Sequence, residues 1–207
     1  CHAHNRLFMM HSDGDLSAAA WSAIVPALNR ASHVHLQGWG EPLLHAALPA
    51  MVEAAKTAGC AVGLTSNGDL LPGASPWIRE LGVDLVTVSV AGSGTRQPGL
   101  RGGAPLAAVL AAAEELARSG PRRRRPRLQL SFLLTAAAAG DLPEVVAAAA
   151  AAGFDEVFAT HLDCTPSREL LDMAAFGDRG LRPGVEQALV AAAAVARRAG
   201  ISFRPPA

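Results

Sequence analysis

Residues 35–42, His35-Leu36-Gln37-Gly38-Trp39-Gly40-Glu41-Pro42, combine residue types that can hold a polar ligand. The two glycines let a ligand approach the backbone closely, and Glu41 offers a carboxylate to a cationic group. Pro42 fixes the chain where it turns towards a helix. The stretch also ends an expected strand, and α/β barrel enzymes place their chemistry at the carboxyl ends of parallel strands. From spacing alone, an ordinary strand–helix turn with a surface glutamate explains these residues as well as a ligand site does.

Small, hydrogen-bonding residues also end the next two expected strands. Thr65-Ser66-Asn67-Gly68 follows one of them, and Ser89-Val90-Ala91-Gly92 follows the other. Three successive strands that finish in this way can line one polar pocket with backbone and side-chain partners.

Histidines suggest a second kind of site. His33 and His35 lie one residue apart on an expected strand and would point the same way, while His161 and Asp163 end a later strand. Such groups ligate zinc or iron in hydrolytic barrels. No further carboxylate or bridging lysine completes a metal constellation, so hydrogen bonding of these imidazoles inside a polar lumen is the favoured interpretation.

The elements that must position these residues alternate strictly between strand and helix. Apolar, β-branched runs predict strands at 33–37, 60–65, 83–90, 127–134, 156–162 and 201–203. Capping residues, glycine stops and alanine-leucine runs predict helices at 15–30, 44–58, 76–81, 105–119, 142–152 and 184–199. Ser17 and Asp141 are the expected N-caps of the first and fifth helices. The alternation predicts a parallel sheet with right-handed crossovers.

The faces of the expected strands distinguish an open doubly wound sheet from a barrel. Val86, Val88 and Val90 alternate with Thr87 and Ser89, so one face is apolar and the other is polar. A doubly wound sheet buries both faces and reads as apolar throughout. The pattern therefore predicts an α/β fold, a partial (β/α)6 TIM-like barrel whose polar lumen holds a ligand and water.

Composition excludes several classes of function. The 207 residues carry 18 basic and 18 acidic side chains, and this balance makes nucleic-acid binding an unfavoured function. The basic run at 121–127 is expected to be a solvated loop on the face opposite the site. No apolar run approaches the ~20 residues that cross a bilayer. Three widely spaced cysteines give no disulfide framework, which indicates a reducing, cytoplasmic location.

Together these motifs resemble the core of the radical S-adenosylmethionine (radical SAM) enzymes. Residues 38–42 resemble the Gly-Gly-Glu-Pro segment of that superfamily, which holds the methionyl amino group of S-adenosylmethionine. Residues 65–68 resemble its Thr-Asn-Gly turn with one extra serine, and Ser89 matches a position that often contacts the ribose or carboxylate. Arg101-Gly102 resembles the Arg-Gly that precedes its fourth helix. The resemblance implies these cofactor-binding residues: Gly38, Trp39, Gly40, Glu41, Pro42, Ser66, Asn67 and Ser89.

The cysteines depart from the pattern of the superfamily. Its members carry Cys-x3-Cys-x2-Cys, which ligates three irons of a [4Fe-4S] cluster, and this sequence has no such triplet. The distance along the chain from Cys1 to the expected strand at His33 suits the last of the three cysteines. The resemblance then implies that Cys1 is a metal ligand and that the first strand and two further cysteines lie upstream. One thiolate cannot hold a four-iron cluster, so the chain alone is expected to be inactive.

The implied function is that of a radical SAM enzyme. Such an enzyme uses a [4Fe-4S] cluster, S-adenosylmethionine and an electron donor to generate a 5′-deoxyadenosyl radical, which abstracts hydrogen from a small-molecule or peptide substrate. Residues 1–163 would form the partial barrel, and 164–207 would add a lid-like loop, a final helix and a short strand to the same domain. Two alternatives stay open: a metal-dependent hydrolase using His33, His35, His161 and Asp163, and a catalytically inactive binding barrel.

Overall fold

The computed structural model describes residues 14–38, 40–94, 104–120, 125–161, 174–175 and 182–206. Six strands form one sheet in the order of the sequence, and every neighbouring pair is parallel. The strands are β1 (His33–Leu36), β2 (Ala61–Ser66), β3 (Leu85–Val90), β4 (Arg127–Leu134), β5 (Glu156–His161) and β6 (Ser202–Arg204). Because β1 and β6 are the two edges, the sheet does not close.

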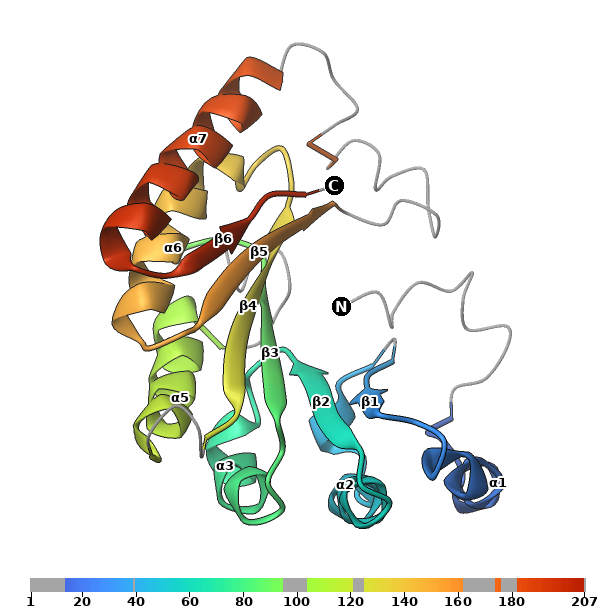
Figure 1. The fold of residues 1–207 in the computed structure, drawn as a ribbon. Coiled ribbons are helices and arrows are strands. Elements are labelled where there is room, and N and C mark those ends of the chain that lie inside the picture. The colour runs from blue at the N-terminus through green and yellow to red at the C-terminus, as the bar shows by residue number, and fades with distance from the viewer. Residues whose placement is uncertain are drawn as a thin grey trace.

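Helices connect these strands and line the outer side of the curved sheet (Figure 1). They are α1 (Ala18–Leu28), α2 (Leu48–Thr57), α3 (Leu71–Glu80), α5 (Leu106–Arg118), α6 (Leu142–Ala151) and α7 (Arg182–Ala199). Two short 3-10 helices, η2 (Pro42–Leu44) and η3 (Ala139–Asp141), follow β1 and β4. This arrangement confirms the predicted α/β fold with a partial TIM-like barrel. The described helices include none that is long and apolar enough to span a membrane.

Local sequence rules explain most helix starts, with two corrections. Ser17 caps α1 as predicted, because its hydroxyl accepts a hydrogen bond from the amide of Ala20 at 3.1 Å. The prediction that Asp141 caps α6 is wrong. Its backbone is already helical at the end of η3, and its carboxylate instead accepts a hydrogen bond from the amide of Ser93 at 2.9 Å.

Helix α3 is longer than the sequence predicted. It begins at Leu71 rather than near Pro76, because a proline at its second position, Pro72, suits a helix start. Four buried residues at helical spacing hold this longer helix against the sheet: Leu71, Ala74, Ser75 and Ile78.

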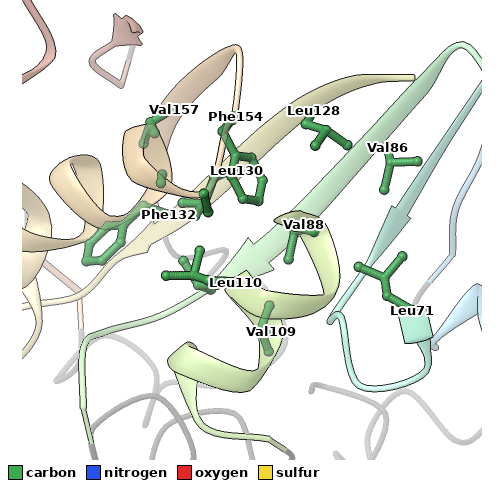
Figure 2. Close-up of a cluster of buried hydrophobic side chains, with 14 of the residues drawn as sticks. Leu71, Val86, Val88, Val109, Leu110, Leu128, Leu130, Phe132, Phe154 and Val157 are labelled. Carbon is green, nitrogen blue, oxygen red and sulfur yellow. The ribbon is translucent and has the colours of Figure 1, made fainter. Parts of the chain in front are cut away.

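The two faces of the sheet differ as the alternation predicted. The even-numbered side chains of β2, β3 and β4 are buried against the helices, and Figure 2 shows Val86, Val88 and Leu130 in one cluster with Val109 and Leu110 of α5. The odd-numbered side chains lie on the inner face, which is mostly polar. We call the space that this inner face borders the lumen.

Two aspartates join neighbouring strands at their amino ends. Asp84 accepts a hydrogen bond from the amide of Val62 at 2.7 Å and donates its own amide to the carbonyl of Val62 at 2.8 Å. Asp155 binds the amide and the carbonyl of Leu128 in the same way, both at 2.9 Å. Each aspartate therefore binds both backbone polar groups of one residue in the preceding strand.

Each of these aspartates also has a basic partner. Lys56 contacts Asp84 at 2.8 Å, with side chains that are 30% and 45% exposed. Arg125 binds both carboxylate oxygens of Asp155 at 2.9 Å, with side chains that are only 4% and 14% exposed. The expectation that the basic run is a solvated loop is therefore wrong for Arg125, since a buried carboxylate from another segment binds it.

Candidate functional site

Glu41 connects the turns that follow β1 and β2. One carboxylate oxygen accepts a hydrogen bond from the amide of Leu43 at 3.1 Å, which caps η2. The other accepts one from the amide of Asn67 at 2.7 Å, in the turn after β2. The residue is half-buried. Glu41 therefore holds together the two turns that the sequence marked as a candidate site, and a cationic ligand would share a carboxylate that already binds two amides.

The turn after β2 is stabilised by its own side chains. Ser66 is buried, and its hydroxyl accepts a hydrogen bond from the amide of Gly68 at 3.0 Å. Asn67 accepts one from the amide of Asp69 at 3.0 Å, and Asp69 in turn accepts one from the amide of Ala104 at 2.8 Å. The hydroxyl of Ser66 therefore supports the turn from the helix side of the sheet.

Thr65, rather than Ser66, supplies the hydroxyl on the inner face. It donates a hydrogen bond to the side-chain oxygen of Gln37 at 2.9 Å and lies 2.8 Å from Nε2 of His35. Because the hydroxyl proton goes to Gln37, the Thr65 oxygen can accept a hydrogen bond from Nε2 of His35. The alternation that assigned the faces of the strands was the sequence signal for Thr65.

The imidazole of His35 lies over Gly63 of the neighbouring strand. A Cβ at Gly63 would lie 2.5 Å from Nδ1 of His35, so the absence of a side chain there makes room for the ring. Burial lowers the pKa of His35, and the charge of nearby His33 lowers it further, whereas a hydrogen bond with Gln37 opposes the shift. A lowered pKa favours the neutral imidazole at neutral pH. The two rings are stacked, with centroids 6.1 Å apart.

Ser89 of β3 adds a hydroxyl to the same face. It is half-buried and lies in register with Ser131 of β4, both at odd positions of their strands. Beyond β3, the amide of Ser93 binds the carboxylate of Asp141, which joins the segment after β3 to the end of η3. The carboxyl ends of β1, β2 and β3 thus lie side by side in the sheet, as the sequence predicted.

His161 does not join the other histidines. Its register partner is Leu134, which is fully buried on the helix side, whereas His33 and His35 are on the inner face of β1. His161 borders a cavity of about 160 Å³ with Leu134, Ala175, Val185, Glu186, Leu189 and Pro206. Within the described residues, no three His, Cys, Asp or Glu side chains gather where a metal ion would bind. The described residues therefore do not support the hydrolase alternative.

Several predicted residues lie outside the described part of the chain: Cys1, Trp39, Arg101, Gly102 and Asp163. Cys60 is described and is a core residue. It is 2% exposed, and its thiol donates towards the carbonyls of Ala31 at 3.2 Å and Leu28 at 3.4 Å.

No protein-family model matches this chain, and no curated protein matches it. Solved structures do. Streptococcus suis SuiB bound to S-adenosylmethionine is 15% identical, with a TM-score of 0.68 over 95% of this chain and 45% of SuiB. SuiB bound to its precursor peptide SuiA is 13% identical, with a TM-score of 0.62 over 94% of this chain and 43% of that one.

A domain of the pyruvate-formate lyase-activating enzyme from Bacteroides vulgatus is also similar. It is 12% identical, with a TM-score of 0.61 over 84% of this chain and 98% of that domain. At these identities the similarity is one of fold. The chain spans less than half the length of SuiB and nearly the whole of the Bacteroides domain.

Proposed function

Because the chain has the fold of a radical SAM core domain, we propose that it binds S-adenosylmethionine at the carboxyl ends of β1, β2 and β3. The segment from Gly38 to Pro42 would hold the amino-acid end of the cofactor. Asn67 and Ser89 would contact the ribose or carboxylate, and Ser66 would act through the turn that it stabilises. Trp39 belongs to the same segment and is proposed to pack on the cofactor.

The hydrogen bond between Glu41 and the amide of Asn67 carries this proposal. It joins two turns that lie 26 residues apart in the sequence, at the edge where parallel α/β folds bind their ligands. The groups at this edge fit the cofactor chemically. S-adenosylmethionine carries an ammonium, a carboxylate and two ribose hydroxyls, and the edge offers backbone carbonyls and amides together with the side chains of Gln37, Thr65 and Ser89.

The described residues do not supply a ligand set for a [4Fe-4S] cluster. Cys60 points into the core, and no other described residue is a cysteine. We retain Cys1 as a proposed ligand. When bound, such a cluster supplies the electron that cleaves S-adenosylmethionine to methionine and a 5′-deoxyadenosyl radical. The part assigned to the described residues is to bind and orient the cofactor and to exclude water from it.

The proposed reaction is abstraction of hydrogen from a substrate that lies in the lumen. The mostly polar inner face of β1 to β6 would line that substrate, and an electron donor would reduce the cluster. The complex of SuiB with its precursor peptide supports a peptide as the substrate.

Isothermal titration of the chain with S-adenosylmethionine tests the proposed site. We expect binding that weakens about tenfold in Glu41→Gln, equivalent to about 1.4 kcal/mol, because a charge-assisted hydrogen bond between the turns is lost. Glu53→Gln is the matched control, since Glu53 is exposed on α2. A folded wild-type chain that does not bind the cofactor, or equal affinities in the two variants, would contradict the proposal.

Iron and sulfide content tests the ligand role of Cys1 separately. Because one thiolate cannot hold a four-iron cluster, the anaerobic reconstitution uses a chain extended before Cys1 by a Cys-x3-Cys-x2 segment. In this extended chain, Cys1→Ser should bind less iron than the parent, whereas Cys164→Ser should bind the same amount. Equal iron content in Cys1→Ser and the extended parent would remove Cys1 from the proposed site.

A further inference from the structure

A nearly buried carboxylate lies on the inner face between β4 and β6. Glu156 is 7% exposed, and one of its oxygens accepts hydrogen bonds from Arg127 at 2.9 Å and from the side-chain amide of Gln129 at 2.6 Å. Its other oxygen lies 3.5 Å from Nε of Arg204. Thr87 extends the network to β3, because its hydroxyl donates to the side-chain oxygen of Gln129 at 3.3 Å.

This network carries an excess of positive charge. Glu156 is the one acidic residue in the six described strands, whereas both Arg127 and Arg204 are cationic there. The two histidines of β1 are the other titratable groups on this face, and a lowered pKa favours the neutral form of His35. One carboxylate shared by two guanidinium groups therefore leaves the inner wall at β4 to β6 with a net charge of +1.

Both guanidinium groups are held in place yet open to solvent. Arg204 lies over the ring of Phe158, 5.0 Å from the ring centroid, and this contact adds to its ion pair with Glu156. The side chains of Arg204 and Arg127 are 62% and 58% exposed. A guanidinium group has five N–H donors in a planar fork that matches a carboxylate, and the contacts within the described residues leave most of these donors available.

The strand register places the backbone of Arg204 level with Ser89, whereas Glu156 and Arg127 lie two and four residues nearer the amino ends of their strands. Arg204 pairs with Phe158, Phe158 with Ser131, and Ser131 with Ser89, so all four lie at one level of the inner face. Three spacings of about 4.8 Å separate β3 from β6, which is about 14 Å along the sheet. A ligand that contacts both Arg204 and the carboxyl end of β3 would therefore have to extend across the lumen.

We propose that Arg204, with Arg127 beside it, binds a carboxylate of the substrate. The inference rests on the proposed function, which places the reacting part of the substrate near the cofactor. It adds that the substrate carries an anionic group at its other end. Glu156 is a positioning residue in this arrangement, because it sets the separation of the two guanidinium groups. The substrate class is thus a peptide or small molecule that carries a carboxylate remote from the position that reacts.

Titration with paired peptides tests this subsite. The probes are two blocked pentapeptides, Gly-Gly-Glu-Gly-Gly and Gly-Gly-Gln-Gly-Gly. Their binding is followed by the NMR signals of the arginine Nε–H groups. We expect the wild-type chain to bind the glutamate peptide at least fivefold more tightly, and the preference to fall with added salt. Arg204→Gln should abolish the preference. Arg198→Gln should preserve it, since Arg198 is exposed in the last turn of α7.

Further arms distinguish a carboxylate subsite from a general anion site and from a purely structural role of the arginines. Glutarate should compete with the glutamate peptide better than inorganic phosphate does, and equal competition by phosphate would overturn the assignment to a carboxylate. Phe158→Leu keeps the charge but removes the ring contact, so it should weaken the preference only in part. An equal preference in wild type and Arg204→Gln would leave the two arginines a structural role alone and overturn the proposal.

A separate titration with S-adenosylmethionine distinguishes this inference from the proposed function. Binding of the glutamate peptide without binding of the cofactor would refute the proposed function and support the subsite. Binding of the cofactor without any preference between the peptides would support the proposed function and refute the subsite.

Discussion

The two aspartates that join neighbouring strands allow a matched test of burial. Asp84 and Asp155 make the same two backbone hydrogen bonds, but the basic partner of the first is 30% exposed and that of the second only 4%. Arg125→Met and Lys56→Met each replace a basic side chain by an unbranched apolar one. Both variants leave the aspartate and its backbone contacts in place.

The expected costs differ by several kcal/mol. Removing one partner of a buried ion pair costs about 3–5 kcal/mol, because the other charge stays buried without it. With Arg125 only 4% exposed, Arg125→Met falls in this class. An exposed pair contributes about 0–1 kcal/mol, and Lys56→Met falls there because its two side chains are 30% and 45% exposed.

Equilibrium unfolding in urea measures both costs. With a slope of about 2 kcal/mol per M, the midpoint should fall by about 1.5–2.5 M in Arg125→Met and by at most about 0.5 M in Lys56→Met. A double-mutant cycle of Arg125→Met with Asp155→Asn isolates the contribution of the pair. Equal shifts in the two single variants, or a shift below about 0.5 M in Arg125→Met, would refute the reasoning from burial.

Three further predictions use other measurements. Gly153→Ala should lower the melting temperature, because Gly153 has a φ of +83° and the new Cβ would lie 2.8 Å from Cβ of Ala117; an unchanged melting temperature would contradict this. Gly63→Ala should displace His35 from Thr65, which NMR detects as a shift of the His35 ring signals, and unshifted signals would show that the ring does not lie over Gly63. Because the pKa of His35 is lowered in the folded chain, the unfolded chain binds a proton at this residue more readily than the folded chain does. The free energy of unfolding should therefore fall as the pH drops through about 6.5, and His35→Gln should reduce this fall. An identical pH dependence in His35→Gln would exclude this contribution.

Periodicity was sufficient to predict the architecture. The alternation of Val86 and Val88 with Thr87 and Ser89 predicted both the strand and its two faces, because the side-chain period of a strand is two whatever packs against it. The same rule, applied to residues 61–66, would have put Thr65 rather than Ser66 on the inner face. Ser66 was selected by motif resemblance, which does not take account of strand parity.

Contacts between distant residues could not be predicted in the same way. Glu41 and Asn67 are 26 residues apart, and Arg125 and Asp155 are 30 apart. Because most arginines are exposed, the composition of the basic run predicts a solvated loop. That composition contains no information about Asp155, which the fold brings next to Arg125. Asp141 was misassigned for a related reason, because Ser93 binds it from a loop 48 residues away.

The backbone contacts of Asp84 and Asp155 also fix how β2 aligns with β3 and β4 with β5. If either strand slid by a single position, the carboxylate would meet the next residue, which presents its amide and carbonyl to the opposite neighbour. A slide of one position would also exchange the inner and outer side chains of that strand. Two residues at the amino ends of the strands thus determine that Thr65 lies on the same side of the sheet as Ser89, and Ser131 on the same side as Phe158. Both aspartates nevertheless lie at the end remote from the proposed cofactor site.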